Sequence, residues 1–131
     1  MLHRDLKLGN LLLDGNMNIK LGDFGLAMFL EKEEDLRCSI CGTPNYMAPE
    51  VVAARQNNSE CGYTVATDVW AMGVLLYTLV VGRPPFETYQ VEETYKKIKN
   101  VSYSFPNDEI RRQLGVDKLS LEFMDLITMI L

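Results

Sequence analysis

The chain has 131 residues, 47% of them hydrophobic and 24% charged, which is the composition of one globular domain with an ordinary core. Thirteen Lys and Arg residues against 18 Asp and Glu residues give a net charge of −5, so we expect no nucleic-acid partner. The longest apolar run, residues 69–81, has 13 residues, whereas a membrane-spanning helix needs about 18 or more. The sequence therefore predicts a buried helix there and no membrane association.

Three cysteines, Cys38, Cys41 and Cys61, are an odd number, and the sequence shows no signal-peptide pattern. Both observations favour an intracellular, reducing compartment. Cys38 and Cys41 form a CxxC pair, which leaves a zinc site or a redox motif open as alternatives. We favour an ordinary loop, because no second ligand pair and no strand-to-helix setting accompany the pair.

The first predicted elements are two short strands, residues 11–13 and 19–21, joined by a turn at Asp14-Gly15. Asn10 precedes this hairpin and Asp23 follows it. A rigid two-stranded unit would hold these two side chains at its base, where both could coordinate the same ion.

Residues 26–47 follow no regular hydrophobic period, and an acidic run at residues 31–35 indicates a solvated loop. A loop of this length in a compact domain is either functional or disordered, and we interpret it as functional. Residues 56–63, rich in Asn, Ser and Gly, also predict a loop.

Four further segments carry helical signals. We expect a short helix at residues 49–55, and an apolar helix at residues 67–82 that is buried on all sides and forms the centre of the domain. Residues 91–98 predict an amphipathic helix supported by Glu92–Lys96 and Glu93–Lys97 ion pairs. Residues 101–114 look irregular around Pro106, and a helical stripe resumes from Leu119 to the last residue.

Three short motifs carry the chemistry. Residues 3–5 read His-Arg-Asp, with Asn10 five positions after the Asp; residues 23–25 read Asp-Phe-Gly, and residues 48–50 read Ala-Pro-Glu. Together they match the catalytic loop and the metal-holding segment of protein kinases. Phosphoryl transfer needs a group that orients a hydroxyl and oxygen ligands for Mg²⁺, so Asp5 is the candidate proton acceptor and Asn10 and Asp23 are candidate metal ligands. Lys7 would place a positive charge near the transferred group.

The chain resembles the eukaryotic protein kinases over essentially its whole length. Lys7 and the pattern Gly42-Thr43-x-x-Tyr46 resemble the serine/threonine class. Residues 7–10, 41–46 and 82–88 are similar to polo-like kinases, while calcium/calmodulin-type and aurora-type kinases remain alternatives. The resemblance implies a mainly α fold with a small β hairpin. Residues 1–131 would form a single partial kinase domain that corresponds to the C-terminal lobe and is incomplete at both ends.

The resemblance also implies roles for individual residues. Asp5, Lys7 and Asn10 would be catalytic, and Asn10 and Asp23 would hold Mg²⁺ beside ATP, with Leu12 as part of the adenine floor. Thr43 would bridge toward Asp5 and Lys7. His3 and Phe24 are interpreted as packing residues that fill the core under the site.

The remaining implied roles concern support and regulation. Asp68 would brace the backbone of the catalytic loop, and Glu50 would be a buried carboxylate whose usual Arg partner is not in the sequence. Ser39 matches the activating phosphosite of polo-like kinases, and Arg4 would receive its phosphate.

The 131 residues contain no Gly-rich phosphate loop and no strand Lys with its Glu partner, which belong to the N-terminal lobe. We therefore expect a polo-like serine/threonine kinase that phosphorylates proteins with ATP, but expect these residues alone to be inactive. The alternative is a non-catalytic module that binds proteins through the helix at residues 91–98 and the long loop. Family resemblance alone implies the nucleus, centrosome or spindle pole.

Overall fold

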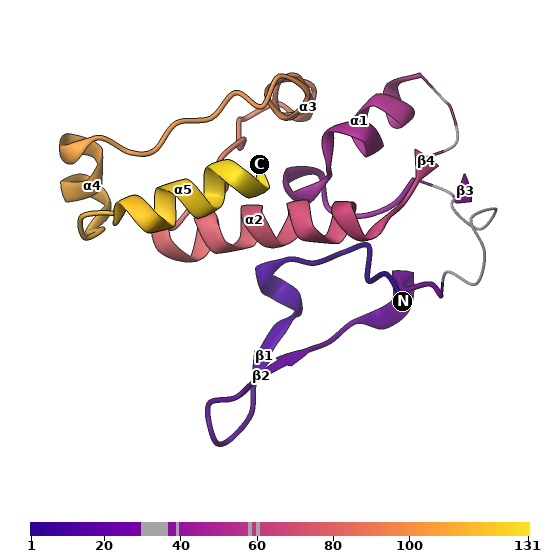
Figure 1. The fold of residues 1–131 in the computed structure, drawn as a ribbon, viewed down its shortest axis with the longest axis horizontal. Coiled ribbons are helices and arrows are strands. Elements are labelled where there is room, and N and C mark those ends of the chain that lie inside the picture. Colours follow the sequence, from indigo (N-terminus) through magenta and orange to yellow (C-terminus); the bar gives the residue numbers. More distant parts are fainter. Residues whose placement is uncertain (30–36, 39, 58, 60) are drawn as a thin grey trace.

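The computed structural model describes residues 1–29, 37–38, 40–57, 59 and 61–131. A long central helix, α2 (Val65–Val81), runs through the middle of the molecule, and the other helices lie mainly along one side of it (Figure 1). The N-terminal hairpin projects from the opposite side. No helix in the described part of the chain is both long enough and apolar enough to cross a membrane.

The predicted hairpin is present, with β1 (Leu11–Leu13) antiparallel to β2 (Ile19–Leu21) and Leu12 opposite Lys20. The predicted turn at Asp14-Gly15 begins the connection between the two strands. The connection is a five-residue loop in which the Asp14 amide donates to the Asn18 carbonyl, and Met17 adopts a positive φ of 64°. The Asp14 carboxylate accepts the amides of Asn16 and Asn18, which stabilises the longer loop.

Helix α2 begins after Thr64, whose hydroxyl accepts the Ala66 amide, and ends at Gly82, which has a φ of 85°. Trp70, Val74 and Val81 are buried, but the prediction that the helix is buried on all sides is wrong. The exposed apolar side chains of this helix are Val65, Val69, Met72, Leu79 and Val80. A helix that is apolar all round can be fully buried only where neighbours surround it, and here they lie mainly on one side.

Helices α1 (Pro49–Gln56) and α3 (Val91–Lys99) pack together above α2. They share a core cluster with Trp70 and Phe86, whose rings stack with centroids 5.6 Å apart. The helix predicted at residues 91–98 is thus confirmed. Its two predicted ion pairs are not formed among the described residues, because exposed flexible side chains gain little from such pairs.

The segment predicted as irregular around residue 106 contains a helix, α4 (Asp108–Leu114), which Asn107 caps by accepting the Ile110 amide. Helix α5 (Leu121–Ile130) follows and lies along α2. The two helices approach closely at Gly73, where an added Cβ would lie 2.5 Å from the Ile130 Cγ2 atom.

The segments that sequence patterns predicted as loops contain short elements. Two-residue strands β3 (Arg37–Cys38) and β4 (Cys61–Gly62) pair antiparallel, and a 3-10 turn, η4 (Pro44–Tyr46), precedes α1. Two-residue strands give no periodic signal, so the sequence could not indicate this pairing. The acidic run at residues 31–35 lies outside the described residues.

Candidate active site

The catalytic-loop motif is held by the central helix. The two carboxylate oxygens of Asp68 accept the backbone amides of His3 and Arg4, at 2.7 and 3.0 Å. Arg4 itself has a positive φ of 67°, a conformation that costs free energy for a residue with a Cβ. Two charge-assisted hydrogen bonds to a carboxylate offset that cost and fix the loop on the first turns of α2.

Asp5 lies at the centre of a hydrogen-bonded group. Its Oδ1 atom accepts both the amide and the hydroxyl of Thr43, at 3.0 and 2.7 Å, and its Oδ2 atom accepts Lys7 Nζ at 2.6 Å. Lys7 Nζ also donates to the Thr43 hydroxyl at 3.2 Å. Asp5 and Thr43 are 38 positions apart in the chain, so this group arises from the tertiary fold.

The same contacts set the charge of Asp5, whose side chain is 8% exposed. Burial raises the pKa of Asp5, but the hydrogen bonds from Lys7 and Thr43 and the charge of Lys7 together lower it further than burial raises it. The pKa of this carboxyl therefore lies below its ordinary value, and Asp5 is ionised at neutral pH.

His3 and Phe24 were predicted to pack beneath the site. His3 is buried, its Nδ1 atom accepts the Asp5 amide at 3.4 Å and its Nε2 atom is 3.1 Å from the Gly22 carbonyl oxygen, which fits the neutral tautomer with the proton on Nε2. The Phe24 ring contacts the His3 ring at 5.1 Å between centroids, but it is 48% exposed. The expectation that Phe24 is buried in the core is therefore wrong.

Asn10 and Asp23 lie at the two ends of the hairpin base, where the Gly22 amide donates to the Asn10 carbonyl at 2.9 Å. Asn10 is buried and its Nδ2 atom donates to the Asp5 carbonyl at 2.8 Å, so the amide oxygen is the end turned away from that bond. Asp23 has a φ of 59° and is exposed, and its Oδ1 accepts a long 3.3 Å bond from the Gly25 amide. Amide and carboxylate oxygens suit Mg²⁺, a hard cation, so this donor set fits the metal.

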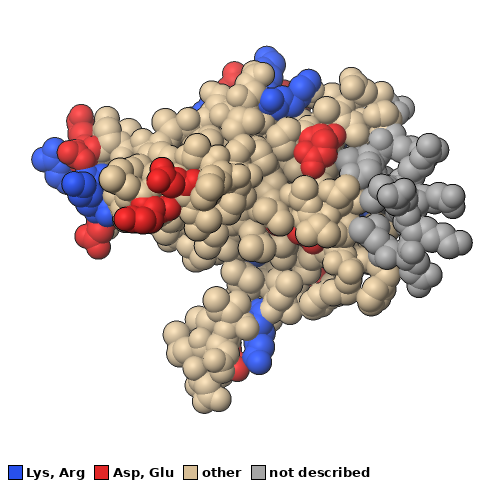
Figure 2. Space-filling model, viewed as in Figure 1, with Lys and Arg blue, Asp and Glu red and all other residues tan. Residues whose placement is uncertain are grey.

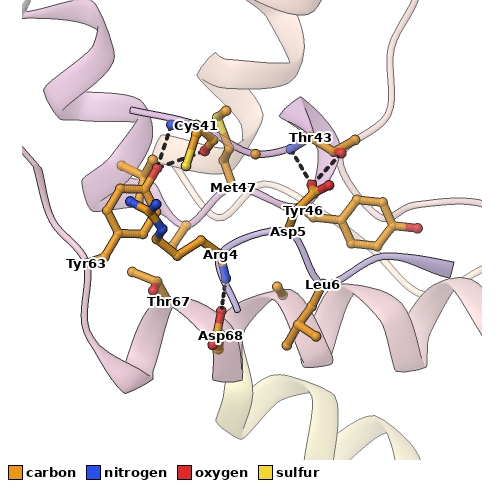
Figure 3. Close-up of a pocket in the computed structure, with 14 residues that line it drawn as sticks. Arg4, Asp5, Leu6, Cys41, Thr43, Tyr46, Met47, Tyr63, Thr67 and Asp68 are labelled. Carbon is orange, nitrogen blue, oxygen red and sulfur yellow. Dashed lines mark hydrogen bonds between the residues drawn. The ribbon is translucent and has the colours of Figure 1, made fainter. Parts of the chain in front are cut away.

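Arg4 extends away from Asp5, into a small cavity behind the catalytic loop (Figure 3). Its Nε atom donates to the Leu26 carbonyl at 2.6 Å, and its guanidinium carbon lies 5.4 Å from the centre of the Tyr63 ring. The Nη1 atom is buried and has no hydrogen-bond partner among the described residues. Ser39, the predicted phosphosite, lies outside the described residues, so its pairing with Arg4 stays a prediction.

The protein kinase domain family model matches residues 1–131. The chain belongs to the protein kinase family. This kinase chain is 52% identical over 115 residues to a probable serine/threonine-protein kinase PLK of Dictyostelium discoideum, a match that covers 88% of the chain and 11% of the relative.

Two further relatives carry polo names. The chain is 48% identical over 106 residues to serine/threonine-protein kinase PLK1 of Xenopus laevis, covering 81% of the chain and 17% of the relative. It is 46% identical over 107 residues to serine/threonine-protein kinase polo of Drosophila melanogaster, covering 82% and 18%. The kinase chain is therefore similar to polo-like serine/threonine kinases, and it spans less than a quarter of the length of each of these three relatives.

Two predicted site residues of the kinase chain lie in settings that the sequence did not define. Leu12 is 57% exposed on β1, on the hairpin that protrudes from the molecular surface (Figure 2), and its role in an adenine site stays a prediction. Glu50, in the first turn of α1, is exposed. The expectation that Glu50 is a buried carboxylate lacking its partner is wrong, because Glu50 lies on the exposed face of α1, whereas its neighbours Val51 and Val52 are buried.

Sequence reasoning missed one residue of this kinase site, Tyr63. It lies between β4 and α2, is 2% exposed, and contacts both Arg4 and the backbone of Cys41. A single aromatic residue at the end of a polar segment has no distinguishing pattern. Cys41 is a free cysteine, whereas the side chain of Cys38 lies outside the described part of the structure, so the CxxC alternatives stay untested.

Proposed function

We propose that the protein containing this chain is a polo-like serine/threonine protein kinase that transfers the γ-phosphoryl group of ATP to hydroxyl groups of protein substrates. The observation that carries the proposal is the hydrogen-bonded group in which Thr43 and Lys7 hold the ionised carboxylate of Asp5. The oxygens of Asn10 and Asp23 lie at the base of the adjoining hairpin. The names of the relatives and the family match support the same activity.

In the proposed reaction, Asp5 accepts a hydrogen bond from the substrate hydroxyl and orients its oxygen toward the γ-phosphorus. A bond forms between that oxygen and the phosphorus, the bond to the oxygen bridging the β- and γ-phosphates breaks, and the hydroxyl proton passes to Asp5. Lys7, held 2.6 Å from Asp5, presents its ammonium group to the negative charge of the transferred phosphoryl group. Asn10 and Asp23 would hold Mg²⁺, which neutralises the charge of the triphosphate when it is bound.

The decisive experiment is a radiolabelled-ATP transfer assay on the full-length protein with and without Asp5→Asn. This change keeps the size of the side chain but removes the proton acceptor, so we expect turnover to fall by about 100-fold or more. Turnover equal to that of the unaltered protein would refute the proposal. Exposed Asp125→Asn, in α5, is the matched control and should leave turnover unchanged.

The same assay on residues 1–131 alone separates the two proposals made for this chain. We propose that these residues by themselves do not transfer phosphate, because they contain no Gly-rich loop and no strand Lys. The alternative function for them is protein binding through α3 and the segment before Thr43. Turnover by residues 1–131 that Asp5→Asn abolishes would overturn the first of these proposals.

Regulation by phosphorylation is a further part of the proposal. The buried Nη1 atom of Arg4, which has no hydrogen-bond partner among the described residues, supports a role in receiving a phosphate on Ser39, three positions before Gly42. In the full-length protein, Ser39→Ala should then lower turnover, and unchanged turnover would contradict this role.

Location at the nucleus, centrosome or spindle pole is proposed from the polo resemblance and is tested by imaging the tagged protein through the cell cycle.

A further inference from the structure

Tyr63 makes two hydrogen bonds to a single residue of the segment that leads to Thr43. Its hydroxyl accepts the Cys41 amide at 2.9 Å and donates to the Cys41 carbonyl at 2.8 Å (Figure 3). The residue is 2% exposed, so water does not compete well for these bonds. The hydroxyl therefore fixes both polar groups of the Cys41 backbone relative to the start of α2.

The face of the same ring lies against Arg4 of the catalytic loop. The guanidinium carbon is 5.4 Å from the ring centre, within the range of a cation–π contact, and Nε donates to the Leu26 carbonyl. One side chain thus contacts the catalytic loop through its ring and the Cys41 backbone through its hydroxyl. Tyr63 therefore ties the two segments that meet at Asp5 to each other.

The Cys41 backbone is joined to Asp5 by a short and tightly packed path. Gly42 has a φ of 105°, and an added Cβ there would lie 2.8 Å from the Arg4 carbonyl oxygen. The next residue, Thr43, donates its amide and hydroxyl to Asp5. Because only one residue separates Cys41 from Thr43, a shift of the Cys41 backbone changes the direction of both donors toward Asp5.

We propose that Tyr63 is a positioning residue of the kinase reaction, which holds the Cys41–Thr43 backbone in the register that directs Thr43 onto Asp5. It touches neither substrate nor ATP and acts through Thr43. The inference rests on the proposed kinase function, since Asp5 must be the group that orients the substrate hydroxyl. It adds to that function a specific route by which the start of α2 supports the catalytic carboxylate.

The test compares three variants of the full-length protein. Tyr63→Phe removes the hydroxyl and keeps the ring on Arg4, and Tyr63→Leu removes both. Tyr95→Phe is the matched control, because Tyr95 is also buried at 7% exposure and also lies under an arginine, Arg55, at 5.9 Å, but on α3. Tyr63→Phe removes both hydrogen bonds to Cys41, so we expect it to lower kcat about fivefold or more, with KM for ATP unchanged. Tyr63→Leu should lower kcat further, and Tyr95→Phe should leave it unchanged.

Amide hydrogen exchange supplies a readout that does not depend on turnover. The Cys41 and Thr43 amides should exchange about fivefold faster in Tyr63→Phe than in the unaltered protein, and at the same rate in Tyr95→Phe. Unchanged exchange at Cys41, or unchanged kcat in Tyr63→Phe, would overturn the positioning role. Failure of the proposed kinase function would give a different result, because turnover would then be the same in Asp5→Asn as in the unaltered protein.

Discussion

The amide and the hydroxyl of Thr43 both donate to one carboxylate oxygen of Asp5, at 3.0 and 2.7 Å. The amide bond does not depend on the side chain at position 43, whereas the hydroxyl bond does. Lys7 reaches both residues, so removal of the hydroxyl also removes one of the acceptors of the lysine ammonium group.

The first prediction follows from this double contact. Thr43→Ala keeps the amide bond and loses the hydroxyl bond, and a hydrogen bond to a charged group contributes roughly 1.5–3 kcal/mol. We expect kcat in the full-length protein to fall about tenfold or more, since about 1.4 kcal/mol corresponds to a factor of ten. Thr43→Ser keeps the hydroxyl and should recover most of the loss. Equal kcat values for the Ala and Ser variants would contradict the argument.

The second prediction concerns acid. The pKa of Asp5 is held below its ordinary value of 3.8 in the folded protein, so the unfolded chain binds more protons than the folded one as the pH falls toward and below 3.8. The stabilisation from Asp5 is therefore fully present above pH 3.8 and is lost as pH falls through the folded pKa. The free energy of unfolding, measured by denaturant titration, should decrease less between pH 7 and pH 3 in Asp5→Asn than in the unaltered protein. An identical pH dependence would contradict the lowered pKa.

The third prediction concerns the brace beneath the catalytic loop. In Asp68→Asn one carboxylate oxygen becomes an NH₂ group, which cannot accept the amide of His3 or Arg4. We expect the free energy of unfolding to fall by about 2 kcal/mol, in the range for a lost hydrogen bond to a charged group. Denaturant titration measures the loss, with Asp125→Asn as the exposed control. A loss no larger than that of the control would mean that the brace contributes nothing.

The fourth prediction concerns the contact between α2 and α5. Gly73→Ala places a Cβ 2.5 Å from Ile130 Cγ2, so we expect a loss of about 1–3 kcal/mol from overpacking. Ile130→Ala removes the clashing methyl group, and the double variant should lose less than the sum of the two single losses. Gly15→Ala is the control, because a Cβ there meets nothing within 4 Å. Additive losses in the double variant would show that the close approach is absent.

Motifs and periodic patterns in the sequence predicted much of this kinase chain. Residues with fixed spacing, such as Asp5 with Asn10 and the Asp23-Phe24-Gly25 segment, were sufficient to identify the family. The position of Pro49 placed α1, and helical periodicity placed α3 and α5, within a few residues of their bounds. These signals are readable because a helix face or a catalytic loop is specified by residues that are near one another in the chain.

The tertiary structure decided which side chains meet and which remain exposed. The contacts of Asp5 with Thr43 and of Tyr63 with Cys41 join residues 38 and 22 positions apart, and no local pattern specifies them. The exposed side of α2 and the solvent-facing Glu50 differ from expectation for a related reason, since the burial of a side chain depends on what packs against it. The sequence alone thus determined the family and predicted the candidate site residues, while packing between distant segments determined how the Asp5 carboxylate is held.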